Sequence, residues 1–139
     1  MKELLIIIPA LNEEKTIKKI IQKTKIFGDV LVVNDGSIDE TKKIAKKNGV
    51  MVISHKINLG YDQAINSGLE FFVKKKYKYV ITIDADGQLP PNYIKLFKKE
   101  LYKNIGWLDK KEVILLKIWA LATFTQYKKT ILDVYDRAI

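Results

Sequence analysis

Four short, largely apolar runs lie along the first 83 residues, and each ends at a polar or turn-forming residue. The runs cover residues 4–8, 30–33, 50–54 and 79–83. Runs of this length without polar alternation are typical of strands that are buried on both faces of a sheet. The segments between them have the apolar spacing of amphipathic helices. This alternation predicts an α/β fold, with a parallel sheet and helices on both of its faces.

Local signals set the expected boundaries of the helices. Acidic residues in a first turn predict a helix that begins near Asn12, and Ser37 with Glu40 forms a capping box for the next helix. This second helix should end at Gly49, because a glycine after a helical pattern is a common stop. Two further helices are expected over residues 61–75 and 91–102.

Polar residues follow each of the four expected strands. They occupy residues 9–13, 34–35, 55–60 and 84–88. In open parallel sheets, ligands bind outside the carboxyl ends of the strands, where the strand order reverses. We therefore expect these four segments to line one crevice. The first of them should also offer free backbone N–H groups at a helix N-terminus to an anion or a nucleotide, unless Asn12 only caps the helix.

Two carboxylates, Asp84 and Asp86, stand directly after the fourth apolar run. Residues two apart in a strand point to the same side, so these carboxylates should lie close together. Such a pair repels itself and is costly to bury without a cation or a donor. Hard divalent cations bind carboxylate oxygens and usually carry phosphate groups. The pair therefore points to a nucleotide-diphosphate substrate, and the alternative is an acidic turn.

The remaining polar residues narrow the choice of site. Asp35 can accept a hydrogen bond from a base N–H or a ribose hydroxyl, or it can belong to a turn. His55 is the only histidine, so it cannot build a histidine-rich metal site, and we interpret it as structural. The glycine patterns of dinucleotide and P-loop sites do not occur. The absence of cysteine excludes disulfides and thiolate metal sites and fits a reducing compartment.

The formal net charge is +9, and Arg137 is the only arginine. A lysine-rich balance favours anionic partners such as nucleotides, lipid phosphates, acidic membranes or nucleic acid. We favour a solvated lysine-rich surface over nucleic-acid binding as the explanation of this charge, and we do not expect nucleic acid as a partner. The first residues lack the charged and apolar regions of a signal peptide. We expect a cytoplasmic protein that could lie at the inner face of the membrane.

The C-terminal segment has a different character. After a break at residues 104–106, residues 113–122 are apolar nearly all round, apart from Lys117, and predict an apolar helix. Its uncharged part is too short for a membrane span, which needs about 20 residues. We expect this helix to pack on the sheet or on a second chain. The alternative is a helix at a membrane surface or in an oligomer interface.

Four motifs, taken together, resemble glycosyltransferase family 2. They are PALNEE at 9–14, NDGSIDET at 34–41, NLGYDQAINSG at 58–68 and DADGQLPP at 84–91. Their order and spacing match over about residues 3–101, and the branch that they resemble most is that of the polyprenol (dolichol) phosphate mannose or glucose synthases. The resemblance implies a GT-A (Rossmann-like) fold with strand order 3-2-1-4. It also divides the chain into a nucleotide-sugar-binding domain over 1–103 and a C-terminal helical segment over 104–139.

The resemblance further implies a UDP- or GDP-sugar donor, a Mg²⁺ or Mn²⁺ cofactor and a role for each matching residue. The nucleoside would be held by Pro9, Leu11, Glu13, Val33 and Asp35. The diphosphate and metal would be surrounded by Asp84, Ala85, Asp86 and Gln88. Asp86 and Gln88 would be the metal ligands, and Asp84 and Asp86 the catalytic residues. The metal would neutralise the departing nucleoside diphosphate while an acceptor oxygen attacks the sugar.

Three features depart from the family pattern. Asp62 stands where the family usually has the later glycine of Asn-Leu-Gly-x-Gly, and Asn34 stands where it has the first of two aspartates. The family also continues past the acidic motif with an acceptor-binding half, whereas here the chain passes into the apolar segment and ends. The resemblance therefore implies a truncated fold with an extra apolar C-terminal helix.

Three functions follow as hypotheses. The first is a glycosyltransferase that acts on a polyprenyl phosphate or a surface polysaccharide. The second is a truncated, catalytically weak nucleotide-sugar-binding module. The third is an assembly protein that binds a second copy of itself or a membrane protein through residues 109–127.

Overall fold

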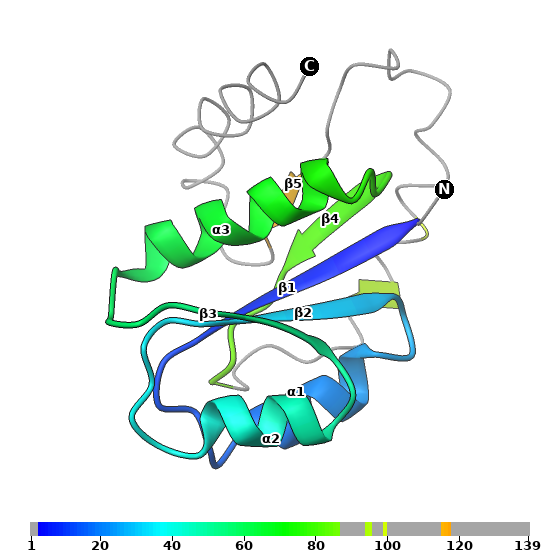
Figure 1. The fold of residues 1–139 in the computed structure, drawn as a ribbon. Helices are drawn as coiled ribbons and strands as arrows, with labels where there is room; N and C mark the ends of the chain where they lie inside the picture. Colours follow the sequence, from blue (N-terminus) through cyan, green and yellow to red (C-terminus); the bar gives the residue numbers. More distant parts are fainter. Residues whose placement is uncertain (1–2, 87–93, 96–98, 100–114, 118–139) are drawn as a thin grey trace.

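The fold is built on one parallel sheet, seen in Figure 1 in a computed structural model that describes residues 3–86, 94, 95, 99 and 115–117. The strand order is β3-β2-β1-β4-β5. The strands are β1 (Leu4–Ala10), β2 (Asp29–Asn34), β3 (Met51–Ser54), β4 (Tyr79–Thr82) and β5 (Leu115–Lys117). The order of the first four strands, 3-2-1-4, confirms the expected topology. It reverses between β1 and β4, which is where a ligand site is expected in such a sheet.

Three helices cover the two faces of this sheet (Figure 1). They are α1 (Ile17–Thr24), α2 (Thr41–Lys47) and α3 (Tyr61–Lys74). Among the described helices, α1 and α2 lie on one face and α3 lies on the other. The predicted helix over 61–75 is therefore confirmed, whereas α1 begins at Ile17, five residues after the expected start.

Side chains of the central strand alternate between the two faces, and both faces are buried. Ile6 and Ile8 pack with the α1 and α2 side, while Leu5 and Ile7 pack with α3. All four are fully buried. Each buried side chain of this size contributes about 1.5–3 kcal/mol relative to exposure. The unbroken apolar run therefore reflects a strand that faces helices on both sides.

Gly68 lets α3 approach this strand closely. A Cβ atom at this position would lie 2.7 Å from Cγ2 of Ile7, which is closer than packed carbon atoms allow. A glycine inside a helix costs about 1 kcal/mol relative to alanine. Here the cost is offset by contact between the helix and the sheet.

The fifth strand corrects the expectation of an apolar helix over residues 113–122. Leu115–Lys117 pairs parallel with β4, in the register Val80↔Leu115 and Thr82↔Lys117. An apolar run of this length fits a buried strand or a buried helix equally, and periodicity alone cannot separate them. The edge of β4 supplies unpaired backbone groups that a neighbouring strand can satisfy, and this decides the outcome. Apart from residues 115–117, the predicted helix, the unit over 104–139 and the partner surface expected over 109–127 lie outside the described residues.

The helix expected over 91–102 falls largely outside the described part of the chain, and a membrane span can be sought only within that part. Only isolated positions of the helix expected over 91–102 are described, and among them Ile94 is fully buried in the core on the α1 and α2 side. Within the described residues, no helix combines the length and the apolar character that crossing a membrane requires.

Candidate functional site

A cavity of about 340 Å³ opens at the carboxyl ends of the strands, on both sides of the point where the strand order reverses. Its walls come from the segments that follow β1, β2, β3 and β4. The lining residues are Pro9, Ala10, Leu11, Glu13, Asp35, Asn58, Gly60, Tyr61, Ala64, Asp84, Ala85 and Asp86. The four polar segments of the sequence therefore meet at one crevice, as topology predicted.

The predicted site residues fall into three groups. Those that line the cavity are Pro9, Leu11, Glu13, Asp35, Asp84, Ala85 and Asp86. Val33 is not among the lining residues, and its side chain is fully buried in the core on the α3 side. Gln88, the second predicted metal ligand, lies outside the described residues. The binding roles themselves stay predictions.

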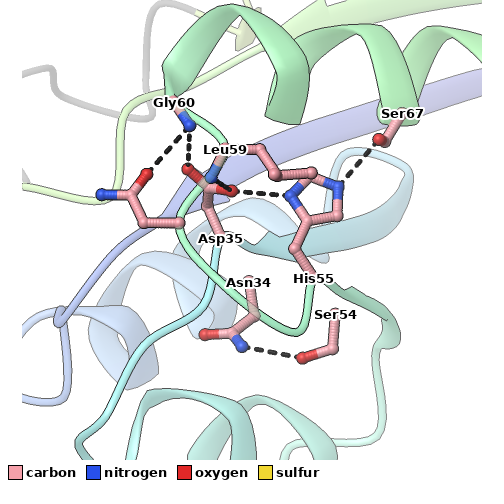
Figure 2. Close-up of polar contacts among 8 residues, drawn as sticks. Asn34, Asp35, Ser54, His55, Leu59, Gly60 and Ser67 are labelled. Carbon is pink, nitrogen blue, oxygen red and sulfur yellow. Dashed lines mark hydrogen bonds and ion pairs between the residues drawn. The ribbon is translucent and has the colours of Figure 1, made fainter.

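Asp35 is a carboxylate of the cavity that accepts three hydrogen bonds (Figure 2). Its Oδ1 accepts hydrogen bonds from Nδ1 of His55 at 2.6 Å and from the backbone N–H of Leu59 at 2.9 Å. Its Oδ2 accepts one from the backbone N–H of Gly60 at 2.8 Å. Burial opposes ionisation, but the hydrogen bonds from His55, Leu59 and Gly60 outweigh it and hold the pKa of Asp35 below its usual value. Asp35 is therefore an ionised carboxylate with a fixed orientation.

The pairing of β2 with β3 explains how Asp35 meets His55. The register Asn34↔Ser54 places the next residue of each strand side by side. The backbone continues this ladder, since the N–H of His55 donates to the carbonyl of Asn34 at 2.9 Å. Asn34 itself points away from Asp35 and donates to Oγ of Ser54 at 2.7 Å (Figure 2).

His55 joins Asp35 to α3. An ionised carboxylate only accepts hydrogen bonds, so Nδ1 of His55 carries the hydrogen in this contact. The other ring nitrogen, Nε2, lies 2.9 Å from Oγ of Ser67, whose hydroxyl can donate to it when the ring is neutral. His55 therefore has a structural role, as expected, and this role is to hold the Asp35 carboxylate at the cavity. The sequence carried a signal for this contact, because Asp35 and His55 each follow a strand of the same parallel pair.

The loops after β1 and β2 are tied together by reciprocal hydrogen bonds. The donors on the first loop are backbone N–H groups. That of Asn12 donates to Ser37 Oγ at 2.9 Å, that of Glu13 to Thr41 Oγ1 at 2.8 Å, and that of Glu14 to Asp39 Oδ2 at 3.1 Å. In return, the N–H groups of Ile38 and Glu40 donate to Asn12 Oδ1 and Glu14 Oε2 at 3.0 and 3.1 Å. The N–H groups that the sequence offered to an anion are therefore occupied by the neighbouring loop.

The start of α2 is also organised differently from the predicted capping box. Ser37 accepts from the first loop, and Asp39 Oδ1 instead accepts from the N–H of Thr41 at 2.9 Å. Burial opposes ionisation of Asp39, but hydrogen bonds led by those from Thr41 hold its pKa below the usual value. Ser37, which looked like a helix cap, therefore ties the loop after β2 to the loop after β1.

The acidic motif lies on the opposite side of the cavity. Asp84 is half-buried, and its Oδ1 accepts a hydrogen bond from the Tyr61 hydroxyl at 2.8 Å. Asp86 is exposed to solvent. Both follow the last residue of β4, Thr82, so strand alternation does not set their relative directions. Among the described residues, no three acidic or histidine side chains gather as a metal cluster. The two carboxylates offer hard oxygen donors of the kind that Mg²⁺ and Mn²⁺ prefer.

Comparison with known sequences places the chain in a family. A family model described as glycosyl transferase family 2 matches residues 5–113. An uncharacterized protein of Methanocaldococcus jannaschii is 40% identical over 120 residues, covering 80% of this chain and 49% of that protein. The UDP-N-acetylglucosamine–dolichyl-phosphate N-acetylglucosaminyltransferase of Methanococcus voltae is 33% identical over 112 residues, covering 67% of this chain and 45% of that protein. The chain spans about half the length of these relatives.

Solved structures resemble this one over the same region. Glucosyl-3-phosphoglycerate synthase from Mycobacterium tuberculosis in complex with UDP gives a TM-score of 0.57 at 26% identity, over 68% of this chain and 38% of that chain. The same synthase in complex with Mn²⁺, UDP-glucose and phosphoglyceric acid also gives a TM-score of 0.57 at 26% identity, over 75% of this chain and 39% of that chain.

Proposed function

The chain belongs to glycosyltransferase family 2 and has the GT-A fold, and on that premise we propose that its cavity binds a nucleotide-diphosphate sugar with Mg²⁺ or Mn²⁺ for sugar transfer. One observation carries the proposal. The cavity is lined by a fixed carboxylate, Asp35, on one side and by the acidic motif, Asp84 and Asp86, on the other. UDP, UDP-glucose and Mn²⁺ are bound by the mycobacterial synthase.

The two sides of the cavity suit the two ends of such a donor. Asp35 is buried, ionised and orientated, so it can accept a hydrogen bond from a base N–H or a ribose hydroxyl. Pro9, Leu11 and Glu13 form the wall beside it. Asp84, Ala85 and Asp86 would then lie beside the diphosphate, where an exposed carboxylate can take part in holding a cation.

Asp86 and Gln88 would hold the metal ion, which supplies positive charge to the departing nucleoside diphosphate. Asp84 would stay nearer the ribose, where its bond from Tyr61 fixes one of its oxygens. We take a polyprenyl phosphate as the acceptor, because a dolichyl phosphate appears in the name of the Methanococcus voltae relative. A lipid phosphate is already ionised near neutral pH, so its attack on the sugar needs little help from a general base.

A second candidate function is a nucleotide-sugar-binding module that is catalytically weak by itself. What favours it is that the roles proposed for the described lining residues, such as Asp35, Asp84 and Asp86, all concern the donor. An acceptor-binding partner would then complete the site, through residues 109–127 or at the inner face of a membrane. Both candidates require donor binding, and only the first requires transfer by the chain alone.

Calorimetric titration of the 139-residue chain with UDP, GDP and their sugars, with and without Mn²⁺, tests the proposal directly. We expect Mn²⁺-dependent binding that Asp86→Asn weakens by more than about 100-fold, since even partners of metal ligands cost 10–100-fold when removed. Glu70→Gln is the matched control, because it removes one negative charge from an exposed position on α3. Absence of binding to every nucleotide at millimolar concentration would contradict the proposal.

Transfer is tested separately, with a UDP- or GDP-sugar, Mn²⁺ and a short-chain polyprenyl phosphate. Formation of a glycosylated lipid phosphate, lost in Asp86→Asn, supports an active transferase. Binding without any product supports the module that needs a partner.

A further inference from the structure

Asp35 keeps one hydrogen-bonding position that the described residues leave unused. An ionised carboxylate has about four acceptor positions on its two oxygens. Oδ1 accepts from His55 and Leu59, and Oδ2 accepts only from Gly60. Although Asp35 is only 3% exposed, it lines the cavity. The remaining position on Oδ2 is therefore the part of this carboxylate that is left for a ligand.

The direction of that position depends on His55. The backbone donors of Leu59 and Gly60 belong to one loop, whereas the ring of His55 approaches from the end of β3 (Figure 2). The far side of the ring is held by Ser67, from within α3. The side chains of both His55 and Asp35 are nearly buried, at 10% and 5% exposure. Their 2.6 Å contact is therefore shielded from competing water and strengthened by the charge of the carboxylate.

We infer that His55, held by Ser67, is a positioning residue for the nucleoside half of the donor. Its own ring does not touch the ligand. It fixes the rotation of the Asp35 carboxylate, so that Oδ2 presents its open acceptor position to a nucleoside N–H or O–H. The inference rests on the proposed function, and it assigns to the only histidine a role in affinity rather than in folding alone.

The test separates the nucleoside from the diphosphate by using two probes, UDP and inorganic pyrophosphate, each titrated calorimetrically with Mn²⁺. His55→Leu removes the donor to Asp35. We expect it to weaken UDP binding by about 10-fold, the scale of one hydrogen bond to a charged group, and to leave pyrophosphate binding unchanged. His55→Asn can restore a donor near the position of Nδ1 and should recover most of the UDP affinity.

Ser67→Ala tests the support of the ring and leaves the contact between His55 and Asp35 in place. It should weaken UDP binding by about 2- to 5-fold, because the ring loses one of its two orienting hydrogen bonds. Tyr77→Phe is the control for loss of a hydrogen bond elsewhere. It deletes the 2.6 Å hydrogen bond to Asp29, which begins β2 at the end of the strand away from the cavity, and should leave the UDP affinity unchanged.

Two results would overturn the inference while leaving the proposed function intact. One is wild-type UDP affinity in a folded His55→Leu protein, and the other is an equal loss of affinity for UDP and pyrophosphate. If His55→Leu does not fold, the Ser67→Ala and His55→Asn proteins decide. Unchanged UDP affinity in Ser67→Ala refutes the positioning role. Loss of affinity for both UDP and pyrophosphate in His55→Asn also refutes it. Absence of UDP binding in the wild type would instead overturn the proposed function and this inference together.

Discussion

Replacing Gly36 by alanine should damage both the fold and the cavity, because two loops of the site touch at this residue. Gly36 directly follows Asp35 and has a φ of +76°. A Cβ atom there would lie 2.4 Å from the backbone nitrogen of Asn58 and 2.4 Å from the carbonyl carbon of Ile57. These are main-chain atoms, so the clash can be relieved only by moving the loop that carries the Leu59 and Gly60 donors to Asp35.

The expected loss of stability has two parts. A left-handed backbone costs a residue with a Cβ atom about 1–2 kcal/mol. Forcing an extra carbon into a well-packed site adds about 1–3 kcal/mol. Gly36→Ala should therefore lower the free energy of unfolding by about 2–5 kcal/mol in total.

Gly49→Ala is the matched control. Gly49 has a φ of +72°, but a Cβ atom at this position would have no heavy atom of the described residues within 4 Å, apart from its own chain neighbours. This variant should therefore lose only the backbone part, about 1–2 kcal/mol. The difference between the two variants isolates the contact between the loops.

Urea denaturation of both variants and of the wild type measures these losses as shifts in the midpoint at constant slope. UDP titration in the presence of Mn²⁺ then measures the effect on the site. We expect Gly36→Ala to weaken UDP binding and Gly49→Ala to leave it unchanged. Equal loss of stability in the two variants, or a wild-type UDP affinity in Gly36→Ala, would refute the reasoning about the loop contact.

Two further predictions concern the hydrogen bonds that shape the cavity. Because the pKa of Asp35 is lower in the folded state, its contribution to stability is present above the unfolded value of about 3.9 and is lost as the pH falls through the folded value. Urea midpoints measured from pH 6 downward should show this loss in the wild type and a shallower one in Asp35→Asn; equal slopes would contradict it. Thr41→Val should lower the free energy of unfolding by about 1–3 kcal/mol, because it leaves the part-buried N–H of Glu13 without its acceptor. Ser37→Ala removes an exposed hydrogen bond and should lower it by less than about 0.5 kcal/mol. Equal urea midpoints for these two variants would contradict that difference.

Much of the fold follows from the sequence because strands and helices carry strong local patterns. The four apolar runs, the inward face of α3 and the stop at Gly49 all reflect burial or backbone conformation within a few residues. The meeting of Asp35 with Asp84 at one cavity also follows, since parallel strands bring their carboxyl ends to one edge of the sheet.

The features that the sequence did not predict depend on contacts between distant segments. Ser37 and Glu40 match a capping box, yet Ser37 accepts from a loop 25 residues earlier. Residues 115–117 match a helical run, yet they pair with β4, because an open strand edge outweighs a weak local preference. In both cases the local pattern allows two structures, and a long-range hydrogen bond selects one.

The two sides of the cavity differ in a way that fits their proposed roles. Asp35 is 3% exposed and accepts hydrogen bonds from His55, Leu59 and Gly60, whereas Asp84 is half-buried and Asp86 is exposed. A carboxylate that accepts a hydrogen bond from a nucleoside binds more tightly when its orientation is already fixed, because a rigid acceptor loses little entropy on binding. A carboxylate that takes up a hydrated cation must remain accessible, because the ion exchanges water for protein oxygens one ligand at a time. Substitutions around Asp35 should therefore alter affinity for the nucleoside, and substitutions at Asp86 should alter dependence on the metal.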